Sequence, residues 1–186
     1  MIKKYTKELY DELKEIIEIH NALNIVLVYN DIRKITYIYI PNNTKYKKLL
    51  NILDKYKNIE IYEYEQVKDK FEERVPLIIY NSKYEDEIDK FKKIKKVSHY
   101  KIGKLLGYQC PKKKFTVNKI RYRYGIEIDE HHIISFVCRK RNDKYLEYLQ
   151  KKAKEIEPIA KKLNFFEVTV SFRISKTLEY IKNVEL

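Results

Sequence analysis

The last third of the chain carries the pattern that most restricts its fold. Apolar residues occupy every second position from Ile120 to Ile128 and again from Val168 to Ile174, which is the period of a strand with one buried face. Between these runs, apolar residues recur every three or four positions from Leu146 to Leu163. That spacing predicts one long helix with a single stripe facing the core.

The remaining signals in this region complete a ββαβ order. Asp129-Glu130 predicts a turn into a second strand over His132–Cys138, Asn142 or Asp143 can cap the helix, and Phe166 is expected to open the last strand. Pro158 removes one backbone donor and predicts a kink. We therefore expect an antiparallel sheet with the helix on one face. Its other face would display Arg121, Arg123, Thr169, Ser171 and Arg173.

The first half of the chain predicts a layered α/β unit. Two runs that are apolar on both sides suggest central strands, and helical spacing precedes and follows them. In order, we expect a helix over Thr6–Ala22, strands over Asn24–Tyr29 and Ile35–Ile40, a helix capped by Thr44, strands over Ile59–Glu65 and Pro76–Tyr80, and a helix capped by Ser82. The predicted class is α/β (α+β), with an N-terminal unit over residues 1–90 and a basic ββαβ unit over residues 91–186.

The positive charge of the chain is confined to its second half. The 186 residues include 40 Lys+Arg and 27 Asp+Glu, a net charge of +13. Residues 1–90 hold 16 basic and 17 acidic side chains, a net of −1, whereas residues 91–186 hold 24 and 10, a net of +14. Residues 91–126 contain 12 basic side chains and no acid. Charge of one sign over such a stretch attracts polyanions.

Nucleic acid is therefore the expected partner, with RNA ahead of DNA, and another polyanion is the alternative. Cations would neutralise phosphates, and Tyr100, Tyr108 and Phe115 could stack on bases. A lysine-rich face that only keeps the protein soluble is the competing interpretation. The predicted binding residues are Lys104, Lys112, Lys113, Lys114, Lys119, Arg121, Arg123 and Arg173.

An enzyme acting on a phosphorylated or other anionic substrate is the second hypothesis. It would use Glu130, His131 and His132, for instance as a metal-dependent nuclease. Adjacent residues of a strand point to opposite faces, however, so the two histidines face one ion only if the turn bends them together. Cys110 among lysines is a candidate nucleophile or a packed thiol. We favour a binding protein, with no catalytic residue, metal or cofactor assigned.

The segment from His99 to Pro111 reads His-Tyr-Lys-Ile-Gly-Lys-Leu-Leu-Gly-Tyr-Gln-Cys-Pro. It resembles a motif of an archaeal domain-of-unknown-function family, in which a His is followed by Gly-x-Leu-Leu-Gly-Tyr-Pro and a pair of cysteines. Gln109 stands where that family has proline, and Pro111 stands where it has the second cysteine. The resemblance covers about 13 residues. It implies an archaeal, intracellular protein and brings no activity with it.

Composition also bears on location and working temperature. No apolar stretch approaches the roughly 18 residues that cross a bilayer, so a cytoplasmic protein without a membrane partner is expected. The cysteines, Cys110 and Cys138, are expected to be reduced thiols. Abundant Lys, Glu, Ile and Tyr suit a thermophile, and an AT-rich genome would produce the same bias. The sequence leaves the oligomeric state open.

Overall fold

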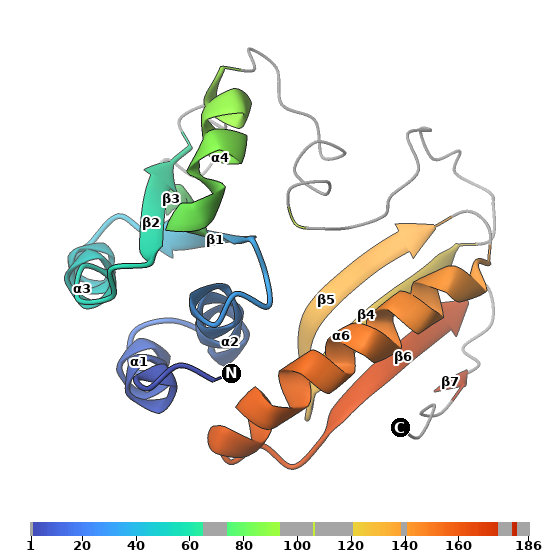
Figure 1. Cartoon of the computed structure of the whole chain (residues 1–186). Coiled ribbons are helices and arrows are strands. Elements are labelled where there is room, and N and C mark those ends of the chain that lie inside the picture. Colours follow the sequence, from blue (N-terminus) through green and yellow to red (C-terminus); the bar gives the residue numbers. More distant parts are fainter. Residues whose placement is uncertain are drawn as a thin grey trace. The chain divides into compact units, whose positions relative to one another are not determined.

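The chain forms the predicted α+β fold in a computed structural model (Figure 1). It divides into two compact units. The structure describes residues 2–64, 74–93, 106, 121–138, 141–174 and 180–181. Unit 1 is Met1–Gly107 and unit 2 is Tyr108–Leu186. Each unit has its own antiparallel sheet.

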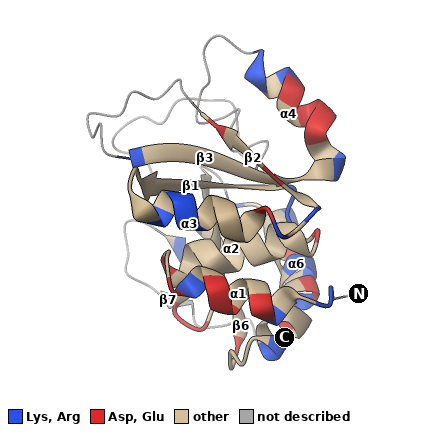
Figure 2. Ribbon diagram, turned by 90° about the vertical axis from the view of Figure 1, so that its left-hand side faces the viewer, with Lys and Arg blue, Asp and Glu red and all other residues tan. Residues whose placement is uncertain are grey.

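Unit 1 is a three-stranded sheet with helices on both faces. Its strand order is β1-β3-β2. Helices α1 to α3 lie on one side of the sheet and α4 on the other (Figure 2). Its elements are α1 (Thr6–Lys14), α2 (Ile19–Tyr29), β1 (Ile35–Pro41), α3 (Thr44–Leu53), β2 (Ile59–Glu63), β3 (Arg74–Asn81), a 3-10 turn (Ser82–Tyr84) and α4 (Glu85–Lys92).

The strand predicted over Asn24–Tyr29 is wrong, because this segment is the second half of α2. Every residue from Ala22 to Asn30 is buried, since α1 packs on one side of α2 and strands β1 and β3 on the other. A helix buried all round has no polar stripe to reveal its period. The helix predicted over Thr6–Ala22 is correspondingly two helices, separated at residues 15–18.

Strand β1 lies at an edge of its sheet and not at the centre, which corrects a second expectation. Both faces of β1 are apolar because helices pack on them, and not because a strand lies on each side of β1. Ile38 and Ile40 are buried on the face where α2 packs. Ile35 and Tyr37 join the cluster around Phe91 of α4 on the other face. Burial of both faces therefore does not require a strand on both edges.

Unit 2 has the predicted ββαβ order, with one further short strand. Its elements are β4 (Tyr122–Ile128), β5 (His131–Cys138), α6 (Asp143–Lys162), β6 (Val168–Ile174) and β7 (Tyr180–Ile181), and the strand order is β5-β4-β6-β7. Helix α6 lies across one face of the sheet (Figure 1). As predicted, Leu149, Ala153 and Ile156 of α6 are buried, as are Tyr124 and Ile126 of β4.

The last main strand begins later than predicted. Phe166 precedes β6, and its side chain is 95% exposed. The segment before the strand is held by Asp129, in the β4–β5 turn, which has a φ of 49°. Its Oδ1 accepts hydrogen bonds from the backbone N–H of Phe166 at 3.1 Å and of Glu167 at 3.0 Å. Helix α6 continues through Pro158, which is exposed.

Candidate nucleic-acid interface

The face of the unit 2 sheet opposite α6 carries mostly polar side chains. Among the described residues of this unit, α6 is the only helix, so no helix in the described part of the unit covers this second face. We call it the open face. Strand register arranges it in three rows across β5, β4 and β6, namely Val137–Arg123–Arg173, Ser135–Gly125–Ser171 and His132–Glu127–Thr169.

The first row places two arginines directly opposite each other. Arg123 and Arg173 are register partners on β4 and β6, and like charges in that relation destabilise a sheet. Arg173 relieves part of this repulsion, since its Nη2 donates to Glu127 Oε1 at 3.3 Å. Arg123 is exposed and forms no ion pair with any residue that the structure describes. The row therefore offers positive charge to an anion.

The middle row is a shallow strip of small side chains. A Cβ added at Gly125 would lie 2.8 Å from the carbonyl oxygen of Ile134 and 2.9 Å from Ser171 Oγ. Ser135 and Ser171 flank the glycine with hydroxyl groups. Because the row is low, the Arg173 side chain can pass over it to reach Glu127.

The third row holds an acid that the predicted face omitted. Glu127 Oε1 lies 3.1 Å from His132 Nδ1, as well as 3.3 Å from Arg173 Nη2. The Glu127 side chain is 15% exposed, whereas that of His132 is 50% exposed. The alternation in β4 already places Glu127 on the same side as Arg123, so this signal was present in the sequence.

The candidate triplet Glu130, His131 and His132 is divided between two faces. His131 packs edge-on against Phe165, which follows α6, with ring centroids 6.2 Å apart. His132 lies on the open face and Glu130 is exposed in the turn. Over the described part of the chain, no group of three His, Cys, Asp or Glu side chains is arranged to hold a metal ion.

Three of the predicted binding residues lie among the residues that the structure describes. Arg123 and Arg173 share the open face, and Arg121 is exposed just before β4. Cys138 is buried. The remaining predictions lie outside the described residues, and these are Lys104, Lys112, Lys113, Lys114, Lys119, Tyr100, Tyr108, Phe115, His99 and Cys110.

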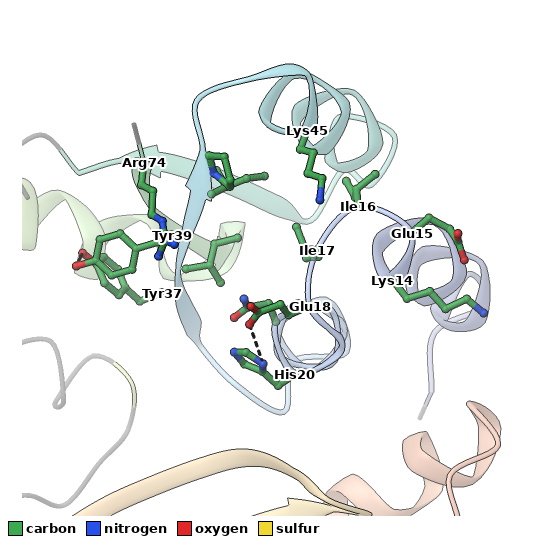
Figure 3. A pocket seen from close by; sticks show the side chains of 14 residues that line it. Lys14, Glu15, Ile16, Ile17, Glu18, His20, Tyr37, Tyr39, Lys45 and Arg74 are labelled. Carbon is green, nitrogen blue, oxygen red and sulfur yellow. Dashed lines mark hydrogen bonds and ion pairs between the residues drawn. The ribbon is translucent and has the colours of Figure 1, made fainter. Parts of the chain in front are cut away.

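Unit 1 contains a groove of about 640 Å³ that the sequence did not reveal (Figure 3). Residues 14–18, 20–21, 37–41, 45 and 74 line it, so its walls come from distant parts of the chain. Lys45 points into the groove. Lys14 is paired with Asp11 at 2.7 Å, and Glu18 lies 3.3 Å from His20. The lining carries both positive and negative side chains and therefore does not indicate one class of ligand. The first row of the open face, in contrast, carries positive charge alone.

Comparison with known proteins adds no functional assignment. No protein family, curated protein or solved structure matches the chain. Of the helices that the structure describes, none combines the length and the apolar character needed to cross a bilayer.

Proposed function

We propose that this protein binds nucleic acid, RNA ahead of DNA, through the open face of unit 2. The opposed pair Arg123 and Arg173 is the observation that carries the proposal. Both side chains start from opposed backbone positions and bring positive charge to the same face, where Arg173 is paired with Glu127 and Arg123 with no acid among the described residues. A phosphate at this face meets two cations and can accept paired hydrogen bonds from a guanidinium. Binding is therefore favoured beyond the attraction of a single surface cation.

The neighbouring side chains suit a nucleic-acid backbone. Hydroxyl groups of Ser135, Ser171 and Thr169 lie in the adjoining rows and can donate to phosphate or sugar oxygens. In the sequence, β4 directly follows a stretch rich in lysine and free of acids, which adds attraction over a longer part of the ligand. Contacts of this kind fix position without reading base sequence.

The shape of the face places RNA ahead of duplex DNA. A sheet surface can receive unpaired nucleotides of a loop or a single strand, which is where proteins most often recognise RNA. Duplex DNA is usually read by a helix or a two-stranded ribbon that enters a groove. A cytoplasmic location would accord with an RNA ligand.

A filter-binding titration tests the proposal with structured RNA and duplex DNA at about 50 mM and about 200 mM salt. The informative variant is Arg123→Ala. Its matched control is Lys154→Ala, which removes an exposed cation from α6, on the other side of the sheet. We expect Arg123→Ala to weaken binding roughly threefold to tenfold and to reduce the salt slope by about one, since one phosphate contact is lost.

Two results would contradict the proposal. The first is the absence of RNA or DNA binding by the full chain at the lower salt concentration. The second is an equal loss of affinity in Arg123→Ala and Lys154→Ala, which would mean that binding depends on net charge and not on the open face.

A further inference from the structure

We propose that the open face also cleaves RNA, with His132 as the general base, Glu127 as its positioning residue and Arg173 as the phosphate-binding group. This inference rests on the proposed RNA binding and adds a chemical step to it. The substrate class is RNA with a free 2′-hydroxyl, and the reaction is attack of that hydroxyl on the adjacent phosphate.

One carboxylate oxygen joins the three side chains. Glu127 Oε1 lies 3.1 Å from His132 Nδ1 and 3.3 Å from Arg173 Nη2, so the two nitrogens are at most 6.4 Å apart, the sum of these distances. When His132 donates its Nδ1–H to the carboxylate, the lone pair of a neutral imidazole is at Nε2. Glu127 is largely covered and His132 is half exposed, which fits a fixed support beneath an accessible base.

A β-bulge puts His132 beside Glu127. Ser135 pairs with Gly125 and Ile134 with Ile126, but the register then shifts, so that His132 pairs with Glu127. Ile133 is the extra residue, and both Ile133 and Ile134 are buried. Regular alternation from Ile134 would have turned His132 toward α6. Bulges are frequent next to active sites because they redirect a side chain in this way.

The same carboxylate holds the phosphate-binding group near the base. Arg173 spans from the first row to the third across Gly125 and the small side chain of Ser171. The Arg173 side chain is 38% exposed, and its guanidinium can contact a phosphate that lies over the middle row. Negative charge that develops on the phosphate would therefore meet a cation positioned before the reaction.

The reaction balances without a metal ion or a redox partner. His132 Nε2 takes the proton of the 2′-hydroxyl, the 2′ oxygen forms a bond to phosphorus, and the bond from phosphorus to the 5′ oxygen breaks. The leaving 5′ oxygen takes a proton from water, and the hydroxide formed takes the proton from the imidazolium. The products are a 2′,3′-cyclic phosphate and a 5′-hydroxyl. DNA lacks the 2′-hydroxyl and would be bound but not cleaved.

The test measures binding and cleavage of the same end-labelled single-stranded RNA by the full chain, in the presence of EDTA. A strand with one ribonucleotide in otherwise 2′-deoxy sequence locates the cut and identifies the cyclic phosphate. We expect cleavage at the ribonucleotide and none in the all-deoxy strand. We expect His132→Ala to lower the single-turnover rate about 100-fold, the scale of general-base catalysis, with RNA affinity unchanged within about threefold.

Further variants separate the chemistry from folding. His131→Ala is the matched control, since this neighbouring histidine packs against Phe165, and it should keep the cleavage rate. His132→Asn keeps a donor toward Glu127 and should be as inactive as His132→Ala. Glu127→Gln should slow cleavage at saturating RNA while tightening RNA binding, because it removes the negative charge from the face. A purely structural role of Glu127 would not produce opposite changes.

The outcomes distinguish the two proposals. RNA that is bound but remains intact overturns the cleavage inference and leaves the binding proposal standing. No RNA binding at low salt overturns the binding proposal itself. Cleavage that persists in His132→Ala and His132→Asn shows that the activity does not come from this cluster.

Discussion

Gly125 has no side chain because β4 passes too close to its neighbours for one. A Cβ would lie 2.8 Å from a backbone oxygen of Ile134 and 2.9 Å from Ser171 Oγ, and the backbone oxygen cannot rotate away. We expect Gly125→Ala to lower the free energy of unfolding by about 1–3 kcal/mol, the usual cost of overpacking. Urea denaturation followed by circular dichroism measures this change.

Ser135→Ala provides the comparison, since Ser135 lies in the same row and is exposed. Its substitution should change the free energy of unfolding by no more than about 0.5 kcal/mol. Equal stabilities of Gly125→Ala and the unaltered protein would show that the strands separate there without cost.

Single residues of the site differ in how far the sequence could predict them. Alternation within regular strands predicts the face on which Arg123, Arg173 and Glu127 lie, although the predicted face omitted Glu127. His132 does not, because a bulge changes which side of the sheet it faces, and no residue in β5 marks that extra position. Phe166 continues the apolar alternation of β6 but lies before the strand and is exposed.

Among the elements, α6 depends on the residue at its N-terminus. The Asn142 side chain accepts from the backbone N–H of Lys144 at 3.1 Å, and the Asn142 N–H donates to Tyr124 Oη at 2.8 Å. We expect Asn142→Ala to lower the free energy of unfolding by about 1 kcal/mol, since a helix donor loses its partner. Asn142→Asp keeps an acceptor and should stay close to the original stability in the same denaturation experiment. If Ala and Asp behave alike, the cap contributes nothing.

Element boundaries were predicted best where one face is exposed. The alternation of β4 and the stripe of α6 are clear in the sequence because the other side of each element carries polar side chains. Helix α2 was misread as a strand because both of its sides are covered. In unit 1 the capping residues lie one position before the predicted ones, Thr44 and Ser82. Asn43 and Asn81 accept the capping hydrogen bonds from the backbone N–H groups. Short polar residues adjacent in sequence compete for that role.

At the scale of the whole molecule, buried tyrosines limit stability at high pH. Burial raises the pKa of Tyr10, Tyr29, Tyr56, Tyr64 and Tyr80 in unit 1 and of Tyr124 in unit 2. Tyr80 also donates to Glu85 Oε2 at 2.6 Å. An unfolded tyrosine has a pKa of about 10, so these groups contribute their full stability below that pH. The contribution is lost as pH rises above about 10, because the unfolded chain releases protons that the folded chain retains.

An alkaline titration followed by tyrosinate absorbance and circular dichroism tests this expectation. Exposed tyrosines should ionise first, without loss of helix signal, and the buried group should ionise together with unfolding. Complete ionisation of all tyrosines with the helix signal intact would contradict it.

Asp129 limits where this chain can be altered. Tips of hairpins usually tolerate insertions, because little else depends on their backbone. The β4–β5 turn is an exception here, since Asp129 bonds to the backbone of Phe166 and Glu167 and thereby fixes the entry to β6. A peptide tag inserted at this turn would disturb the strand that carries Arg173. The exposed middle of α6 is a better place for a surface label.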